Sequence, residues 1–117
     1  MPETALERAT ADYYRGSYAS ALHHAQQAAP RNKAESQERE CLLCECLQFL
    51  GEFSESLQLA ESALHSDLNA VLTARYWGVI GRIRLDQHRS EEAAEALRKG
   101  IRAAEKGSDI FTLASLQ

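Results

Sequence analysis

The feature that most constrains this chain is a short pattern that occurs three times. Residues 15–25 read RGSYASALHHA, residues 51–64 read GEFSESLQLAESAL, and residues 88–101 read HRSEEAAEALRKGI. When Gly16, Gly51 and His88 are aligned, the copies are 35 and 37 residues apart, a period that is typical of stacked helical hairpins. The pattern therefore predicts a repeat protein in which each copy is one pair of helices.

Apolar residues recur at spacings of three and four on both sides of the turns, as they do along one face of an α-helix. Good helix formers dominate the composition, and the chain has only two prolines and six glycines, so helix propensity agrees with the periodicity. We expect helices over residues 3–14, 17–29, 33–50, 53–66, 69–86 and 90–106. Gly107 is expected to end the last of these, and Ser108 to begin a seventh helix over residues 108–117.

The turn residues have a physical role in this scheme. A glycine at the end of a helix adopts the left-handed conformation that satisfies its last carbonyl groups. Ser17 or Ser90 is then expected to cap the next helix. Five positions after each turn residue a small side chain follows, where two helix backbones are expected to approach closely: Ala21, Ser56 and Ala93.

These residues resemble the tetratricopeptide repeat (TPR) family over about residues 3–106. The third copy carries the resemblance best, through Trp77, Ile80, Gly81, Ala93 and Leu97; the second carries it through Leu43, Cys44, Leu47, Gly51, Phe53 and Ala63; and the first through Gly16, Tyr18, Ala21 and Ala28. His88 departs from the family pattern where a turn glycine is expected, and Gly100 departs where a late alanine is expected.

The resemblance implies an all-α fold, a right-handed α-α superhelix (a TPR-like solenoid) of three helical hairpins plus the start of a seventh helix. It implies one domain over residues 1–117, with repeats at about 3–32, 37–68 and 74–106 and a partial helix at 108–117. Such a stack has a concave inner face that binds a peptide or protein partner.

The resemblance also implies which residues line that groove: Leu6, Thr10, Tyr13, Tyr14, Cys41, Glu45, Gln48, Phe49, Arg75, Gly78, Arg82 and Asp86. Aromatic rings suit anchoring and arginines suit orienting a peptide. The alternative for some aromatics, Tyr13 above all, is a place in the core of a hairpin. A clamp for the carboxylate tail of a chaperone is not expected, because only Arg75 fits the charge pattern of such clamps.

Composition excludes several classes of function. The chain has 17 acidic and 13 basic residues and a formal net charge of −4, which argues against a partner that is nucleic acid. No segment has the ~20 continuous apolar residues of a membrane span, and the first residues do not resemble a signal peptide. Three cysteines, an odd number, within six positions favour a reducing, cytoplasmic location.

The segment CLLCEC contains the three cysteines, Cys41, Cys44 and Cys46, and raises the question of a zinc site. On a helix Cys46 points about 200° away from Cys44, and no second Cys or His pair follows at a suitable spacing. We therefore expect small apolar residues at a helix interface, with Cys41 as a candidate accessible thiol. His23 and His24 are expected to be partly exposed. No metal, no cofactor and no enzymatic activity are predicted.

The sequence thus predicts a binding scaffold for a protein or peptide, serving as the docking or regulatory part of a larger cytoplasmic protein. The alternative is a homodimer, or another homo-oligomer, formed through the apolar C-terminal segment, whose contact residues would be Ile110, Phe111, Leu113 and Leu116. Either the chain is part of a longer repeat protein that covers this segment, or the segment packs against another copy.

Overall fold

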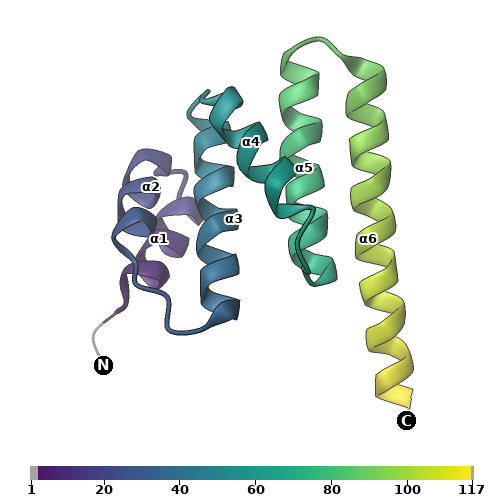
Figure 1. Ribbon diagram of the computed structural model, residues 1–117, viewed down its shortest axis with the longest axis horizontal. Coiled ribbons are helices and arrows are strands. Elements are labelled where there is room, and N and C mark those ends of the chain that lie inside the picture. Colours follow the sequence, from purple (N-terminus) through teal and green to yellow (C-terminus); the bar gives the residue numbers. More distant parts are fainter. Residues whose placement is uncertain (1–2, 117) are drawn as a thin grey trace. The chain divides into compact units, whose positions relative to one another are not determined.

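A computed structural model describes the backbone of residues 3–116 and the side chains of residues 3–107. Over this range the chain forms six helices and no strand: α1 (Ala5–Tyr14), α2 (Tyr18–Gln27), α3 (Lys33–Phe49), α4 (Phe53–Ala63), α5 (Ala70–Asp86) and α6 (Ser90–Leu116) (Figure 1). The expectation of an all-α fold is confirmed. Among the described helices none is both long enough and apolar enough to cross a membrane.

The chain divides into two compact units, residues 1–59 and residues 60–117, called unit 1 and unit 2 below. Unit 1 contains α1, α2, α3 and the first part of α4. Unit 2 contains the end of α4 and the pair α5 and α6, which run side by side (Figure 1).

The three turns share one backbone geometry. Gly16, Gly51 and His88 all have positive φ, at 81°, 85° and 61°, which is the left-handed conformation. In each turn the next amide donates to a carbonyl five positions earlier, closing the end of the first helix: Ser17 to Asp12 at 2.9 Å, Glu52 to Leu47 at 2.9 Å and Arg89 to Arg84 at 2.8 Å. The alignment of Gly16, Gly51 and His88 as equivalent turn residues is therefore confirmed.

The residues around the turns are also equivalent in their packing. Seven positions before each turn residue, and five positions after it, the residue is buried in all three copies: Ala9 and Ala21, Cys44 and Ser56, Gly81 and Ala93. In the second copy the Ser56 hydroxyl donates to the carbonyl of Cys44 at 2.8 Å. Small residues at these points allow the two helices of a pair to approach closely.

Side-chain caps begin three of the helices. Thr4, Asn32 and Asn69 each accept a hydrogen bond from the amide three positions later, at 3.1, 2.9 and 2.8 Å, so these residues satisfy amides that the first turn leaves unpaired. The prediction that Ser17 caps its helix is wrong, because its side chain makes no capping hydrogen bond. Its backbone is already held by the turn, and the ψ of 69° departs from the extended conformation of a capping residue.

Unit 1 has a core of mostly small residues from its first three helices. Ala9, Ala21, Ala25, Leu42 and Cys46 form one buried cluster. The Arg39 guanidinium on α3 reaches the carbonyl of Ala25 near the end of α2, with Nε at 2.8 Å, a favourable place for a cation. The core and this hydrogen bond together hold α3 against α2.

Glycines on α5 and α6 bring these two helices together in unit 2. A Cβ atom added at Gly107 would lie 2.5 Å from the Cβ of Ala70, and one added at Gly100 would lie 3.3 Å from the Cβ of Trp77. The helix α6 continues through Gly107 to Leu116. The prediction that Gly107 ends a helix and that a seventh helix begins at Ser108 is therefore wrong. Gly107 lies inside α6 because only a glycine fits where α6 passes Ala70.

Candidate functional site

Three of the residues predicted to line a groove, together with Tyr18, form an aromatic surface in unit 1. The ring of Tyr13 meets the rings of Tyr14 and Phe49 edge to face, at centroid distances of 5.5 and 6.0 Å. Tyr18 stacks on Phe49 at 4.4 Å. Tyr14 is 82% exposed and Phe49 is 40% exposed, so the cluster, called the aromatic surface below, presents two rings to solvent.

The other predicted groove residues of unit 1 are less accessible. Leu6 packs against the core, and the Thr10 hydroxyl donates to the carbonyl of Leu6 at 2.9 Å. On α3, three further predicted positions are buried: Cys41, Glu45 and Gln48. The Glu45 carboxylate accepts from the Tyr13 hydroxyl at 3.5 Å, so it contributes to positioning the aromatic surface from beneath.

The four predicted groove residues of unit 2 all lie on α5. Arg75, Gly78 and Arg82 are half-buried, and Asp86 is exposed at the end of the helix. The backbone at Gly78 is open, because an added Cβ atom would meet only the guanidinium of Arg82 at 3.5 Å. These four residues as partner contacts stay a prediction.

All three cysteines are buried, and none of them forms a disulfide. The suggestion that Cys41 is an accessible thiol is therefore wrong. The thiol of Cys44 donates to the carbonyl of Ser56 at 3.2 Å. Burial, followed by the charge of Glu45, raises the pKa of Cys46 to about 12, so this thiol stays protonated at neutral pH and is a poor nucleophile.

A polar cluster that sequence reasoning missed lies between α1 and α2. The Asp12 side chain is 6% exposed and accepts hydrogen bonds from the Ser20 hydroxyl and from His24 Nδ1, both at 2.8 Å, and from the Arg15 guanidinium. The hydrogen bonds from Ser20 and then His24 lower the pKa of Asp12, with a smaller effect of Arg15 and with burial opposing them. The cluster ties the two helices together.

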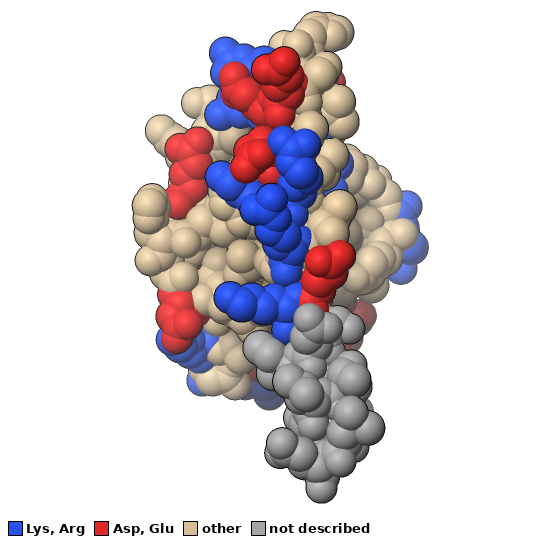
Figure 2. Space-filling view, turned by 90° about the vertical axis from the view of Figure 1, so that its right-hand side faces the viewer, with Lys and Arg blue, Asp and Glu red and all other residues tan. Residues whose placement is uncertain are grey.

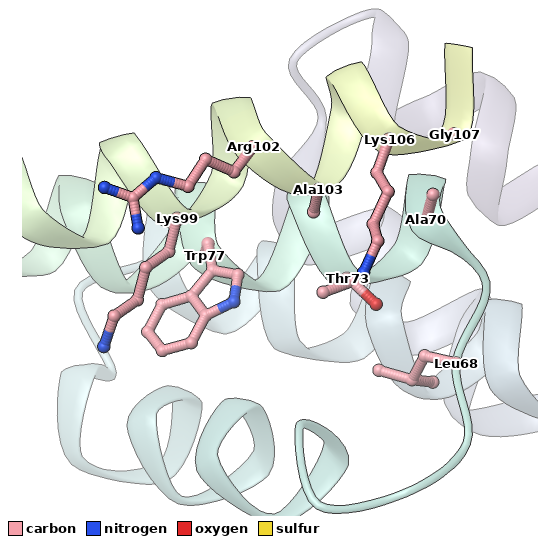
Figure 3. Close-up of a pocket in the computed structure, with 9 residues that line it drawn as sticks. All are labelled: Leu68, Ala70, Thr73, Trp77, Lys99, Arg102, Ala103, Lys106 and Gly107. Atoms are coloured by element: carbon pink, nitrogen blue, oxygen red, sulfur yellow. The ribbon is translucent and has the colours of Figure 1, made fainter. Parts of the chain in front are cut away.

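A second feature that sequence reasoning missed is a cleft of about 530 Å³ between α5 and α6. Trp77 forms part of it, half-buried, with Lys99 Nζ 4.7 Å from the centre of the ring. Figure 3 shows Lys106 extending from α6 toward Thr73 on α5. This feature, called the basic cleft below, is lined by Leu68, Ala70, Thr73, Trp77, Lys99, Arg102, Ala103, Lys106 and Gly107.

The basic cleft could not be recognised from the resemblance, which places Trp77 among the signature residues of a hairpin. The signal in the sequence was the spacing of Lys99, Arg102 and Lys106, three and four positions apart, which puts three cations on one side of a helix. The place of Trp77 beside them depends on how α5 and α6 are rotated against each other, and a single helical pattern does not contain that information.

Comparison with known proteins finds no matching family model, no matching curated protein and no matching solved structure. Within the described part of the chain, no three His, Cys, Asp or Glu side chains are placed to hold a metal ion. A function for the chain therefore has to be inferred from its geometry and its charge.

Proposed function

We propose that this chain is a TPR-like helical-repeat protein that binds a protein or peptide partner through the aromatic surface of unit 1. The observation that carries the proposal is the exposure of Tyr14 at 82% and Phe49 at 40%, in contact with the better-buried ring of Tyr13. Exposed tyrosines that are held by neighbouring rings are favourable anchors, because they bury a large area on binding and lose little conformational freedom.

The three turns support the repeat part of the proposal. They share the left-handed turn residue, the hydrogen bond that spans five positions, and the small buried residues on either side. Three equivalent helix pairs are what a TPR-like superhelix needs, because each pair buries a face against its neighbours in the stack.

The proposed role is binding rather than catalysis, in a cytoplasmic setting. The buried thiols support both parts, since Cys46 has a pKa of about 12 and none of the three cysteines forms a disulfide. Free thiols are typical of a reducing compartment, and a thiol that does not ionise cannot act as a nucleophile.

The test compares the partners that the intact chain retains from a cell extract with those retained by the variants Tyr14→Ala and Phe49→Ala, using quantitative mass spectrometry. We expect the bound partner to be lost with both variants while the helical content by circular dichroism is unchanged. Leu85→Ala is the matched control, because Leu85 is an exposed apolar residue of unit 2. Retention of the same partner by Tyr14→Ala and Phe49→Ala would contradict the proposal.

A second candidate function is homo-oligomerisation through α6. Leu97 and Ile101 are 40% and 58% exposed and lie one turn apart on the same side of the helix. The side chains predicted to extend this contact, those of Ile110, Phe111, Leu113 and Leu116, lie outside the described residues. The two candidates differ in their surfaces, so variants on α6 separate them from variants on the aromatic surface.

A further inference from the structure

One side of α6 carries charges in a segregated order. At about 100° per residue, six charged positions fall within a sector of about 100°, opposite the side that carries Leu97 and Ile101. All six are exposed, and the acidic ones precede the basic ones: Glu91, Glu92, Glu95, Lys99, Arg102 and Lys106. Figure 2 shows Lys and Arg side chains gathered into a stripe on the face that carries α6.

Two clefts adjoin this charged side, and both contain Trp77 and Lys99. The basic cleft, of about 530 Å³, lies toward Arg102 and Lys106 (Figure 3). The second, of about 290 Å³, lies toward Glu91, Glu92 and Glu95 and is called the acidic cleft. Trp77 and Lys99 therefore stand where a basic binding region meets an acidic one.

We propose that the two clefts form one site for a short peptide segment of a partner protein. The acidic residues of the segment contact Lys99, Arg102 and Lys106, an apolar residue packs against Trp77, and a basic residue faces the acidic cleft. The proposal rests on unit 2 alone and does not require that the aromatic surface of unit 1 bind anything.

The length of the basic region suits a peptide. Lys99 and Lys106 are seven residues apart, about 10 Å along the axis of α6, which an extended chain covers in about three residues. Three cations at this spacing therefore match a run of three or four residues rich in Asp and Glu. The Trp77 ring and the neighbouring Leu68 and Ala103 supply the apolar wall that a purely electrostatic site would lack.

The order of the charges favours a peptide over nucleic acid. A nucleic acid is negative along its whole length, so a strand that contacts Lys99, Arg102 and Lys106 would continue past Glu91, Glu92 and Glu95, and the net charge of −4 would repel it. Two of the glutamates are paired with arginines: Glu92 Oε2 lies 3.4 Å from Arg84 Nε, and Glu95 Oε2 lies 2.8 Å from Arg98 Nη2. Exposed ion pairs of this kind are weak, and the same holds for a pair between these glutamates and a basic residue of the ligand. The acidic cleft therefore orients a ligand more than it holds it.

The experiment titrates the full chain with the synthetic peptide Lys-Lys-Gly-Leu-Asp-Glu-Asp and follows the emission of Trp77, the single tryptophan of the chain. We expect a saturable change with a dissociation constant in the micromolar range. Arg102→Glu and Lys106→Glu, both at exposed positions, should each weaken binding at least tenfold, and so should an increase of NaCl from about 50 to about 500 mM.

The controls test the order of the charges as well as their number. Lys33→Glu makes the same change of charge at an exposed position of unit 1 and should leave the titration unchanged. A peptide of the same composition with alternating charges should bind at least fivefold more weakly. Equal binding of the two peptides, the absence of any saturable change, or tighter binding of a single-stranded oligothymidine would each overturn the proposal.

Discussion

At the scale of single residues, the turns are closed by hydrogen bonds between residues three to five positions apart, whereas the Asp12 side chain is held by residues of the neighbouring helix. His88 takes the left-handed conformation that the alignment with Gly16 and Gly51 predicted, because a turn is a local property of the chain. The Asp12 cluster was not predicted, since it depends on contacts with Ser20 and His24 across a helix pair. Periodicity marks a helix face but does not say which polar side chain on it will be enclosed.

The Asp12 cluster leads to a prediction about acid stability. Because the folded state lowers the pKa of Asp12, its contribution to stability is present above its ordinary value of 3.8 and is lost as the pH falls below it. Asp12→Asn should lower the melting temperature at pH 7. It should also reduce the further fall in melting temperature between about pH 5 and about pH 3. Thermal unfolding followed by circular dichroism across this range measures both effects.

Two other carboxylates, Glu35 and Glu95, also have pKa values lowered by arginine partners and contribute to the acid dependence of stability. The readout is therefore the difference in melting temperature between the variant and the unmodified chain at each pH. Asp86→Asn is the matched control, because Asp86 is exposed at the end of α5. The melting temperature of this variant should change with pH as that of the unmodified chain does. An Asp12→Asn protein with the same acid slope as the unmodified chain would rule out this role.

At the scale of helices, α6 presents three different sides. One side packs on α5 through small residues and part of Leu97, the second exposes Ile101 and the rest of Leu97, and the third carries the charges beside Trp77. The sequence predicted the positions of α1 to α5 to within three residues, because periodicity and turn signals agree there. It failed at Gly107, where helix propensity and turn preference favour a stop while the close approach to Ala70 requires a glycine within the helix.

Two glycines that lie inside helices should respond oppositely to alanine. Gly107→Ala places a Cβ atom 2.5 Å from that of Ala70, so we expect the free energy of unfolding to fall by about 1–2 kcal/mol. The Cβ atom added by Gly78→Ala contacts only the end of Arg82, at an ordinary distance. This variant should therefore raise the free energy of unfolding by about 0.5–1 kcal/mol. Urea unfolding measures both, and Ala70→Gly in the Gly107→Ala background should recover part of the loss.

A stable Gly107→Ala protein would show that α5 and α6 separate there at no cost, and the account of Gly107 as a packing residue would then be wrong. A loss of stability in Gly78→Ala would show that the site beside Arg82 is more confined than the geometry indicates.

At the scale of the whole molecule, the question is whether the exposed side of α6 joins two copies. The homo-oligomer hypothesis predicts a mass that rises with concentration from 13.0 kDa toward twice that value in light scattering. Ile101→Asp and Phe111→Asp should each keep the mass at 13.0 kDa, whereas Leu85→Asp, at an exposed site on α5, should not. A constant mass of 13.0 kDa for the unmodified chain would contradict the homo-oligomer hypothesis. Binding of a different protein would then be the remaining candidate function.

The three equivalent turns also bear on how the chain reaches its structure. Each turn is closed by hydrogen bonds between residues three to five positions apart, and the helix contacts within each unit join elements that are neighbours, or nearly so, in the chain. Chains dominated by such short-range contacts fold within microseconds to milliseconds. The first three helices, which share one buried core and are complete by Phe49, are thus able to form before the later residues are synthesised, which shortens the time during which apolar side chains are exposed to aggregation.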